Sequence, residues 1–387
     1  MNRIPVVHVI TKLEFGGAQL NTLYTVASLD RERFEPVLMT GPGGYLMPEA
    51  RDQGLDLRIV PSMDRAIKPG VDAATFRELG KLLEPYRGRP AIVHTHSSKA
   101  GILGRWAARK VRFPMIIHSI HGFGFTPAQS RPKRFLFQAA ERFTSRITDH
   151  FIAVSDSNRV DGIRYGLFGP DRCTVIRSGF DLELFRSAEK LPLDLLDNLG
   201  ISRGSPLILM VACLKPQKAP MDFVELAAKV HREIPLARFL IAGDGELRGV
   251  LENEIRRLGL SDICLPLGWR EDIPELMKSS RVVVLTSRWE GLPRVIPQAK
   301  AVGRPVVATA VDGSVEAIRD GVDGYLCSPG DVDSMAERVI RLLKDPDLAD
   351  RMGREGNRVV DEFDQDMMVR KQEELYERLL REKGINV

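Results

Sequence analysis

The sequence predicts an α/β protein with two doubly wound domains, each a parallel sheet with helices on both faces. Short apolar runs alternate with helical patterns along the chain, which is typical of such sheets. The chain has 387 residues, enough for two domains with separate cores. A strand–loop–helix start at Val6 recurs at Pro206, so the two halves begin alike.

Composition sets bounds on function. The hydrophobic content of 43% and charged content of 28% are ordinary for a soluble globular protein, and a net charge of +4 leads us to expect no nucleic-acid partner. The sequence has no apolar run near the ~20 residues that cross a bilayer, and its first residues resemble a strand rather than a signal peptide. Four scattered cysteines fit a reducing compartment, so we expect a cytoplasmic protein.

The first half, residues 1–185, is predicted to form one domain. Its strands are expected at 6–10, 36–40, 56–60, 91–94, 115–119, 151–155 and 174–176, with helices at 18–29 and 73–83. Gly16 and Gly17 lie in the loop between the first strand and the first helix. They would let a phosphate or sugar phosphate approach the backbone closely, although many glycine pairs only form turns.

Residues 186–205 have weak periodicity and end in Gly-Ser-Pro, which predicts a linker to a second domain over 206–365. Strands are expected there at 206–212, 239–242, 263–268, 282–285, 305–309 and 325–326, and helices at 221–232 and 335–343. A strongly charged helix is predicted near the end of the chain, at about 367–383.

The loop after the strand at 282–285 is the main candidate site. It places Glu290 at the carboxyl end of a parallel strand, where open α/β sheets bind ligands. Pro293 suits the first turn of the next helix. The amides of Leu292 and Arg294, with the charge of Arg294, suit a phosphate. The alternative is that Glu290 only caps this helix.

This loop resembles the signature of the family-four retaining glycosyltransferases, which have the GT-B fold and use nucleotide sugars. That signature has a Glu before a helix and a second Glu eight positions later. Glu290-Gly291-Leu292 matches the first half, whereas Gln298 stands at the second position, where the family's Glu holds the ribose. Gln can still hydrogen-bond hydroxyl groups. The resemblance covers most of the chain.

The resemblance implies a UDP- or GDP-sugar donor and roles for several residues. Lys218 would clamp the diphosphate. Cys213 stands where the family has an Arg, and Lys215 or Arg294 would compensate for the missing charge. His121 would contact the sugar. The other expected donor-binding residues are Gly16, Gly17, Trp269, Leu292, Pro293 and Gln298.

The resemblance also implies how the reaction proceeds. The anomeric configuration is retained by a front-face displacement, in which the leaving phosphate takes the acceptor's proton and Glu290 positions the donor's hydroxyls. Residues 366–387 would cross back to pack on the first domain, and the linker would act as a hinge.

We expect no metal and no cofactor besides the donor substrate. His94 and His96 are two positions apart, but the sequence around them supplies no other ligand. Asp331 and Asp333 precede a helix, for which N-capping is the better interpretation.

Residues 131–147 raise the question of a membrane contact. Leu136 and Phe143 share one helical face with alanines, and the opposite side carries Phe135 and the arginines Arg131, Arg134, Arg142 and Arg146. Such a basic face suits the inner surface of an anionic membrane. The alternative is a surface helix whose apolar face packs on the core.

The hypothesis is therefore a metal-independent retaining glycosyltransferase that acts on a glycan or lipid-linked acceptor in cell-surface polysaccharide or glycolipid assembly. A nucleotide-sugar 2-epimerase of the same fold and a nucleotide-sugar-binding protein without transfer activity remain alternatives. The first would need acid–base residues near the sugar that we do not find, and Cys213 and Gln298 are the reason to consider the second.

Overall fold

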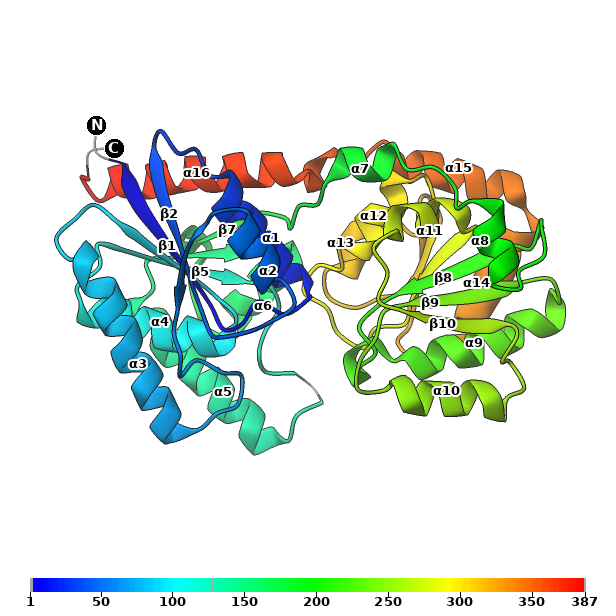
Figure 1. Ribbon diagram of the computed structural model, residues 1–387, viewed down its shortest axis with the longest axis horizontal. Helices are drawn as coiled ribbons and strands as arrows, with labels where there is room; N and C mark the ends of the chain where they lie inside the picture. Colours follow the sequence, from blue (N-terminus) through cyan, green and yellow to red (C-terminus); the bar gives the residue numbers. More distant parts are fainter. Residues whose placement is uncertain (1–2, 127, 386–387) are drawn as a thin grey trace. The chain divides into compact units, whose positions relative to one another are not determined.

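The structure is a computed structural model that describes residues 3–126 and 128–385. It divides into two compact units, one built from the chain up to Gly179 and from Gln365 onward, the other from Phe180–Asp364. Each unit has one parallel sheet between layers of helices (Figure 1). The predicted fold class is confirmed.

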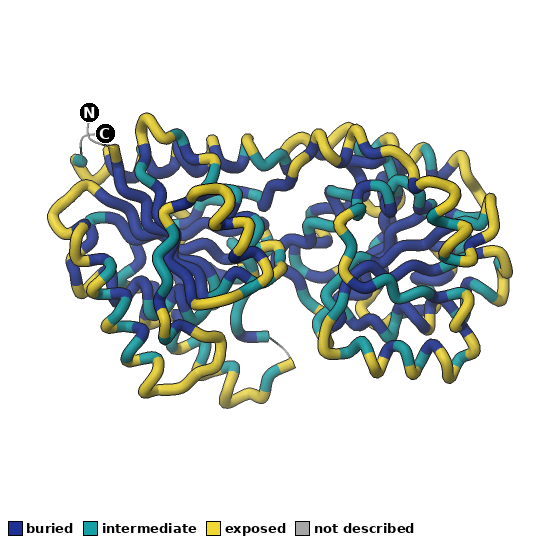
Figure 2. The backbone as a smooth tube through the Cα atoms, in the orientation of Figure 1, coloured by how far each residue is buried: buried dark blue, intermediate teal, exposed yellow. Residues whose placement is uncertain are grey.

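The sheet of the first unit has seven strands in the order β3-β2-β1-β4-β5-β6-β7. β1 is buried along its whole length, since helices cover both faces of the sheet, and this explains its continuous apolar sequence (Figure 2). The strands are β1 (Ile4–Ile10), β2 (Phe34–Thr40), β3 (Asp56–Ile59), β4 (Ile92–His96), β5 (Met115–Ile120), β6 (His150–Ala153) and β7 (Cys173–Val175).

Two layers of helices enclose this sheet. One face packs on the helices α3 and α4, and the other on α1 and α16, where Tyr376 and Leu380 are buried against Phe34 and Ile92. The last helix therefore belongs to the first unit. The helices are α1 (Gly17–Ser28), α2 (Met47–Asp52), α3 (Pro69–Leu83), α4 (Ser98–Lys110), α5 (Arg131–Thr144), α6 (Asp156–Arg164) and α16 (Gln365–Glu382).

The sheet of the second unit has six strands in the order β10-β9-β8-β11-β12-β13. The strands are β8 (Leu207–Val211), β9 (Arg238–Ala242), β10 (Cys264–Gly268), β11 (Val282–Leu285), β12 (Val306–Thr309) and β13 (Gly324–Cys327). The helices are α7 (Leu182–Arg186), α8 (Leu193–Asn198), α9 (Pro220–Glu233), α10 (Arg248–Arg257), α11 (Ile273–Ser279), α12 (Val295–Ala301), α13 (Ser314–Ala317), α14 (Val332–Lys344) and α15 (Pro346–Asn357).

Residues 186–205, expected as a linker, lie inside the second unit. They contain α8, and Leu191 and Ile201 are 5% and 2% exposed. The amide of Leu191 also donates to Ser279 Oγ over 2.7 Å. Because these side chains are buried, the segment is anchored to its unit rather than free. The chain passes from the first unit to the second after Gly179 and returns before Gln365.

Among the residues that the structure describes, no helix is both long enough and apolar enough to span a bilayer.

Candidate functional site

The sheet of the second unit has a topological switch point between β8 and β11. These strands are neighbours, but the chain leaves β8 towards β9 on one side and leaves β11 towards β12 on the other. The loops after the two strands therefore diverge at the carboxyl edge, which is where open α/β sheets form their ligand crevice. Lys218 lies in the first loop and Glu290 in the second.

The structure brings Lys218 and Glu290 into direct contact. Lys218 Nζ forms an ion pair with Glu290 Oε1, and Ser287 Oγ donates to the same oxygen over 2.6 Å. The amide of Glu290 donates to Asp312 Oδ2 over 2.6 Å, and the residue is only 8% exposed. Glu290 is thus held at its side chain and its backbone, so its carboxylate has a fixed position rather than a free rotamer.

Further hydrogen bonds join the two loops. Thr286 Oγ1 donates to the carbonyl of Lys218 over 2.8 Å, the amide of Arg288 donates to the carbonyl of Gln217 over 2.7 Å, and Gln217 Nε2 donates to the carbonyl of Trp289 over 2.8 Å. Sequence analysis missed these contacts, because they join residues about 70 positions apart.

A third loop, after β12, supports the site from the other side. Asp312 has a left-handed backbone with φ of 39°. At Gly313 a Cβ would lie 2.2 Å from the carbonyl oxygen of Gly291, so only glycine lets the loop approach this closely. Sequence analysis did not single out Asp312. The available signal was its position in the loop after β12, the strand next to β11, because loops after neighbouring parallel strands lie at the same edge of the sheet.

Arg294, in the loop after β11, adds a half-buried cation to the site. Burial lowers the pKa of its guanidinium to about 10, so the group keeps its charge at neutral pH. Its Nε is buried and has no hydrogen-bond partner among the described residues. An unsatisfied buried donor is costly, which makes Arg294 a candidate for holding an anion. Residue 213, where the family has an Arg, is a half-buried cysteine.

The other donor-binding candidates lie on the same unit. Leu292 and Pro293 are buried, and α12 begins at Val295 rather than at Pro293 as expected. Gln298 is half-buried on α12. Lys215 is exposed in the loop after β8, and Trp269 follows β10 and is 46% exposed.

The remaining candidates belong to the first unit, whose sheet has its own switch point between β1 and β4. Gly16 and Gly17 end the loop after β1, and α1 begins at Gly17. Thr11 Oγ1 and Ser97 Oγ, 2.7 Å apart, join the loops that follow these two strands. His121 directly follows β5, next to β4 in the sheet.

Sequence analysis missed the hydrogen-bonded chain behind His121. His96 Nδ1 lies 3.1 Å from His121 Nε2, and His96 Nε2 lies 3.0 Å from His8 Nδ1. Burial lowers the pKa of His8 to about 3 and that of His121 to about 4, and burial also lowers the pKa of His96. All three rings are therefore neutral at pH 7.

Three histidines of this region could together hold a metal ion. The ligand atoms of His8, His94 and His96 lie within 4.8 Å of one another. However, His94 already bonds Tyr376 Oη at 2.5 Å and Ser119 Oγ at 2.7 Å, so coordination would displace hydrogen bonds. Sequence analysis considered His94 and His96 but not His8, which the sheet register places opposite His94.

Of the two acidic residues expected to cap a helix, Asp331 has that role, whereas Asp333 lies inside α14 and pairs with Lys229 Nζ over 2.6 Å. Asp331 Oδ1 accepts from the amide of Ser334 over 3.0 Å, and its other oxygen accepts from Ser334 Oγ. This is an N-cap at the start of α14.

The structure does not fit the alternative in which α5 packs its apolar face on the core. Leu136 and Phe143 are 64% and 56% exposed, and Phe135 is 72% exposed. The helix instead buries Glu141, which pairs with the fully buried Arg105 over 2.6 Å. A polar anchor fixes this helix, so its apolar residues are left at the surface.

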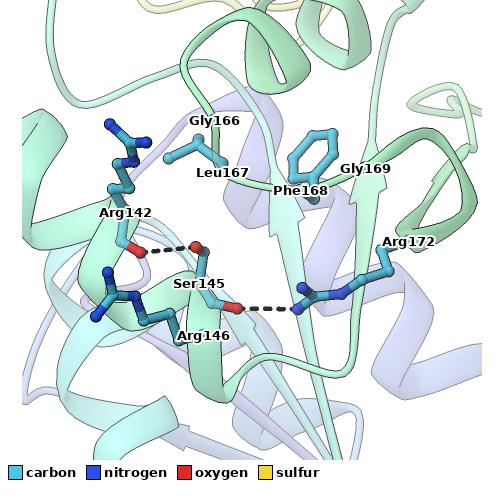
Figure 3. A pocket seen from close by; sticks show the side chains of 8 residues that line it. All are labelled: Arg142, Ser145, Arg146, Gly166, Leu167, Phe168, Gly169 and Arg172. Carbon is cyan, nitrogen blue, oxygen red and sulfur yellow. Dashed lines mark hydrogen bonds between the residues drawn. The ribbon is translucent and has the colours of Figure 1, made fainter.

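The end of α5 borders an open, basic pocket of about 390 Å³. Its lining residues are Arg142, Ser145, Arg146, Gly166, Leu167, Phe168, Gly169 and Arg172 (Figure 3). Arg172 Nη2 donates to the carbonyl of Ser145 over 2.9 Å, while Arg142 and Arg146 have no ion-pair partner among the described residues. The two expected membrane arginines at this end of α5 are therefore available to an anion, and Arg131 and Arg134 lie at its other end.

Comparison with known proteins covers both units. The profile of the glycosyl transferases group 1 matches residues 194–359, and that of glycosyltransferase family 4 matches residues 15–184. An Escherichia coli protein, UDP-Gal:alpha-D-GlcNAc-diphosphoundecaprenol alpha-1,3-galactosyltransferase, is 33% identical over 379 residues, 97% of each chain.

Two further similarities are more distant. The N,N'-diacetylbacillosaminyl-diphospho-undecaprenol alpha-1,3-N-acetylgalactosaminyltransferase of Campylobacter jejuni is 24% identical over 91% of this chain and 93% of its own. The crystal structure of Anabaena HepE with UDP and glucose aligns with a TM-score of 0.83 at 21% identity, covering 97% of this chain and 100% of that one. Since its Escherichia coli relative matches along nearly the whole length, the chain belongs to the group 1, or family-four, glycosyltransferases of the GT-B fold.

Proposed function

We propose that this protein transfers a sugar from a UDP-sugar to a lipid-linked sugar acceptor, with retention of the anomeric configuration. The observation that carries the proposal is the Lys218–Glu290 pair at the switch point of the second unit. Anabaena HepE was solved with UDP, and the names of the Escherichia coli and Campylobacter jejuni relatives specify acceptors on diphosphoundecaprenol. These similarities support a UDP-sugar donor and a polyprenyl diphosphate acceptor.

The residues of the second unit suit a donor with a diphosphate leaving group. Lys218 and Arg294 supply positive charge where the leaving diphosphate gains negative charge. Glu290 carries a fixed carboxylate that accepts hydrogen bonds from sugar hydroxyls. In the proposed step the acceptor oxygen bonds to the anomeric carbon on the face from which the diphosphate departs, and the acceptor's proton passes to the leaving phosphate oxygen. The step needs neither a protein nucleophile nor a metal.

We also propose a peripheral contact with the cytoplasmic face of the membrane through α5. The exposed Phe135, Leu136 and Phe143 would enter the headgroup region, and the arginines of α5 would meet anionic lipid. Glu141 and Arg105 anchor this helix, so Phe135 and Leu136 stay exposed. Phe143 also stacks on Trp106, with ring centroids 5.1 Å apart. A lipid-linked acceptor makes such a contact useful.

The test incubates the purified protein with UDP-galactose, UDP-N-acetylgalactosamine or UDP-glucose and a sugar-bearing polyprenyl diphosphate. We expect a lengthened lipid-linked product with an α-linkage, assigned by NMR, from an α-configured donor. A β-linkage would overturn retention, and an epimerised sugar without transfer would favour the epimerase. Binding of UDP without turnover of any of these donors would leave only the binding protein.

A further inference from the structure

The row of hydrogen-bonded histidines in the first unit ends at His121, and it bears on which ring nitrogen of His121 carries the proton. His8 lies on β1, His96 on β4 and His121 just beyond β5, so one row of hydrogen bonds crosses three neighbouring strands. The two links measure 3.0 Å and 3.1 Å. His8 and His96 are buried, whereas His121 at the carboxyl edge is half-buried. The row therefore connects the core of the sheet to its ligand edge.

A neutral imidazole has one N–H donor and one bare nitrogen that accepts. Each ring in the row uses both kinds of atom if it bonds two neighbours, so all donors must point in the same direction. Only two arrangements are possible. Either each ring carries its proton on Nδ1 and donates outward, or each carries it on Nε2 and donates inward.

The inner end of the row decides between the two arrangements. His8 Nε2 is buried and has no hydrogen-bond partner among the described residues. If the donors pointed inward, this atom would be an orphaned N–H, and buried N–H groups without a partner are rarer in proteins than under-used acceptors. If they point outward, the orphan is only a lone pair. The outward arrangement, with the proton on Nδ1 of each ring, is therefore favoured.

We propose that His8 and His96 fix His121 as the Nδ1–H tautomer, so that His121 offers its ligand a hydrogen-bond donor and His96 acts as a positioning residue. The matching ligand atom is an acceptor oxygen, such as a sugar hydroxyl or ring oxygen. His121 does not serve as a general base through Nδ1, because that atom already carries the proton. Only the assignment of a sugar oxygen rests on the proposed function.

The tautomers can be read without any substrate. In ¹⁵N-histidine-labelled protein at pH 7.5, long-range ¹H–¹⁵N correlation separates a protonated ring nitrogen from a bare one. We expect His8, His96 and His121 to show a protonated Nδ1 and a bare Nε2, with peaks assigned from those lost in single His→Asn variants. A protonated Nε2 on His121, or averaging between both forms, would overturn the proposal.

Variants then separate positioning from simple packing. His96→Leu removes the donor to His121, so His121 should lose its fixed tautomer and kcat/KM should fall about three- to tenfold, the equivalent of one hydrogen bond. His96→Asn keeps a donor near the position of Nδ1. This variant should therefore restore most of the fixed tautomer of His121 and most of kcat/KM. His118→Leu is the matched control, since His118 is equally buried but bonds Thr95 instead.

The outcomes distinguish this inference from the proposed function. A wild-type protein with the expected tautomers but no transferase activity would overturn the function alone. An active protein in which His96→Leu and His118→Leu behave alike, or in which His96→Asn does not rescue, would overturn the positioning role alone.

Discussion

The two units have the same kind of ligand edge, but the chemistry at the two edges differs. In the first unit, the edge at the switch point is backed by buried histidines that burial keeps neutral. In the second unit, the corresponding edge holds the Lys218–Glu290 ion pair. Asp312 accepts from the amide of Glu290, and the half-buried Arg294 follows Glu290 in the same loop.

Under the proposed function, this difference fits each edge to a different ligand. A charged edge suits a diphosphate, because a charge-assisted hydrogen bond is about twice as strong as a neutral one. A neutral edge of fixed donors and acceptors suits hydroxyl groups, which carry no charge to attract. The following predictions test whether charge on one edge and neutrality on the other are both needed.

The largest expected effect comes from Glu290→Gln, which removes the carboxylate from the charged edge. Transfer should fall by at least about a hundredfold, since one lost electrostatic contact in a transition state costs this much, while UDP binding stays nearly unchanged. Steady-state rates and calorimetric UDP titration measure the two quantities. Glu337→Gln, an exposed change on α14, is the control. Near-normal turnover of the Glu290→Gln variant would contradict a role of Glu290 in transfer.

The second prediction concerns how the stability of the first unit, which carries the neutral edge, changes as the pH falls. The folded pKa values of His8 and His121, about 3 and 4, lie below the ordinary 6.5, so the unfolded chain binds more protons below pH 6.5. Their contribution to stability is complete above that pH and is lost as the pH falls towards 4. Between pH 7.5 and 5.5 the two together should remove about 3 kcal/mol from the free energy of unfolding.

Urea unfolding at these two pH values tests this loss in each unit separately. Trp106 alone reports on the first unit in a variant with Trp269 and Trp289 changed to Phe, and Trp106→Phe leaves reporters only in the second. From the higher to the lower pH, we expect the urea midpoint of unfolding to fall further for the first unit than for the second. Equal shifts for both reporters would contradict a neutral, buried histidine row.

Lys218→Ala should weaken UDP binding roughly ten- to a hundredfold, because a hydrogen bond between charged groups is worth about 1.5–3 kcal/mol. Turnover should also fall, since the same charge faces the leaving diphosphate. Lys215→Ala tests the other lysine of the same loop. If Lys215→Ala weakens UDP binding and Lys218→Ala does not, the clamp lies at the exposed lysine.

A smaller effect is expected from the surface of α5. Changing Arg131, Arg134, Arg142 and Arg146 to Gln should reduce binding to vesicles with anionic lipid, as each basic residue contributes about 1 kcal/mol at best. Wild-type binding should weaken in 1 M salt, where the screening length is ~3 Å.

The charge-matched control for α5 changes four exposed arginines of the second unit, Arg203, Arg256, Arg257 and Arg358, to Gln. It should bind vesicles like the wild type. Equal losses in both quadruple variants would mean that net charge, rather than α5, attracts the protein. A wild-type protein that ignores anionic vesicles at low salt would point to a soluble acceptor.

The smallest expected effect is that of chelation, because Lys218 and Arg294 supply the positive charge that a divalent ion would otherwise provide. Activity should be the same in EDTA as in magnesium. Loss of activity that magnesium or manganese restores would contradict the proposed step. Loss that only zinc restores would instead direct attention to His8, His94 and His96.

Much of the second unit's site was predictable because its signals are local. The strand at 282–285, the loop with Glu290 and the cap at Asp331 depend on residues within a few positions of one another. The sequence left two alternatives open for α5, since the apolar spacing of Leu136 and Phe143 gave no sign that Arg105, on another helix, would pair with Glu141. The packing of residues 186–205 was hidden for the same reason, because Ser279, which accepts from the amide of Leu191, lies in a distant part of the chain.

The sequence by itself determined the alternation of strands and helices, the two similar halves and the loops that carry Lys218 and Glu290, because hydrophobic periodicity and turn residues act locally. Only the tertiary structure decided which loops meet. Strand order places β8 beside β11 and so joins Lys218 to Glu290, and it places β1 beside β4 and so joins His8 to His96. Sheet order depends on the packing of the whole chain, and no short stretch of sequence records it.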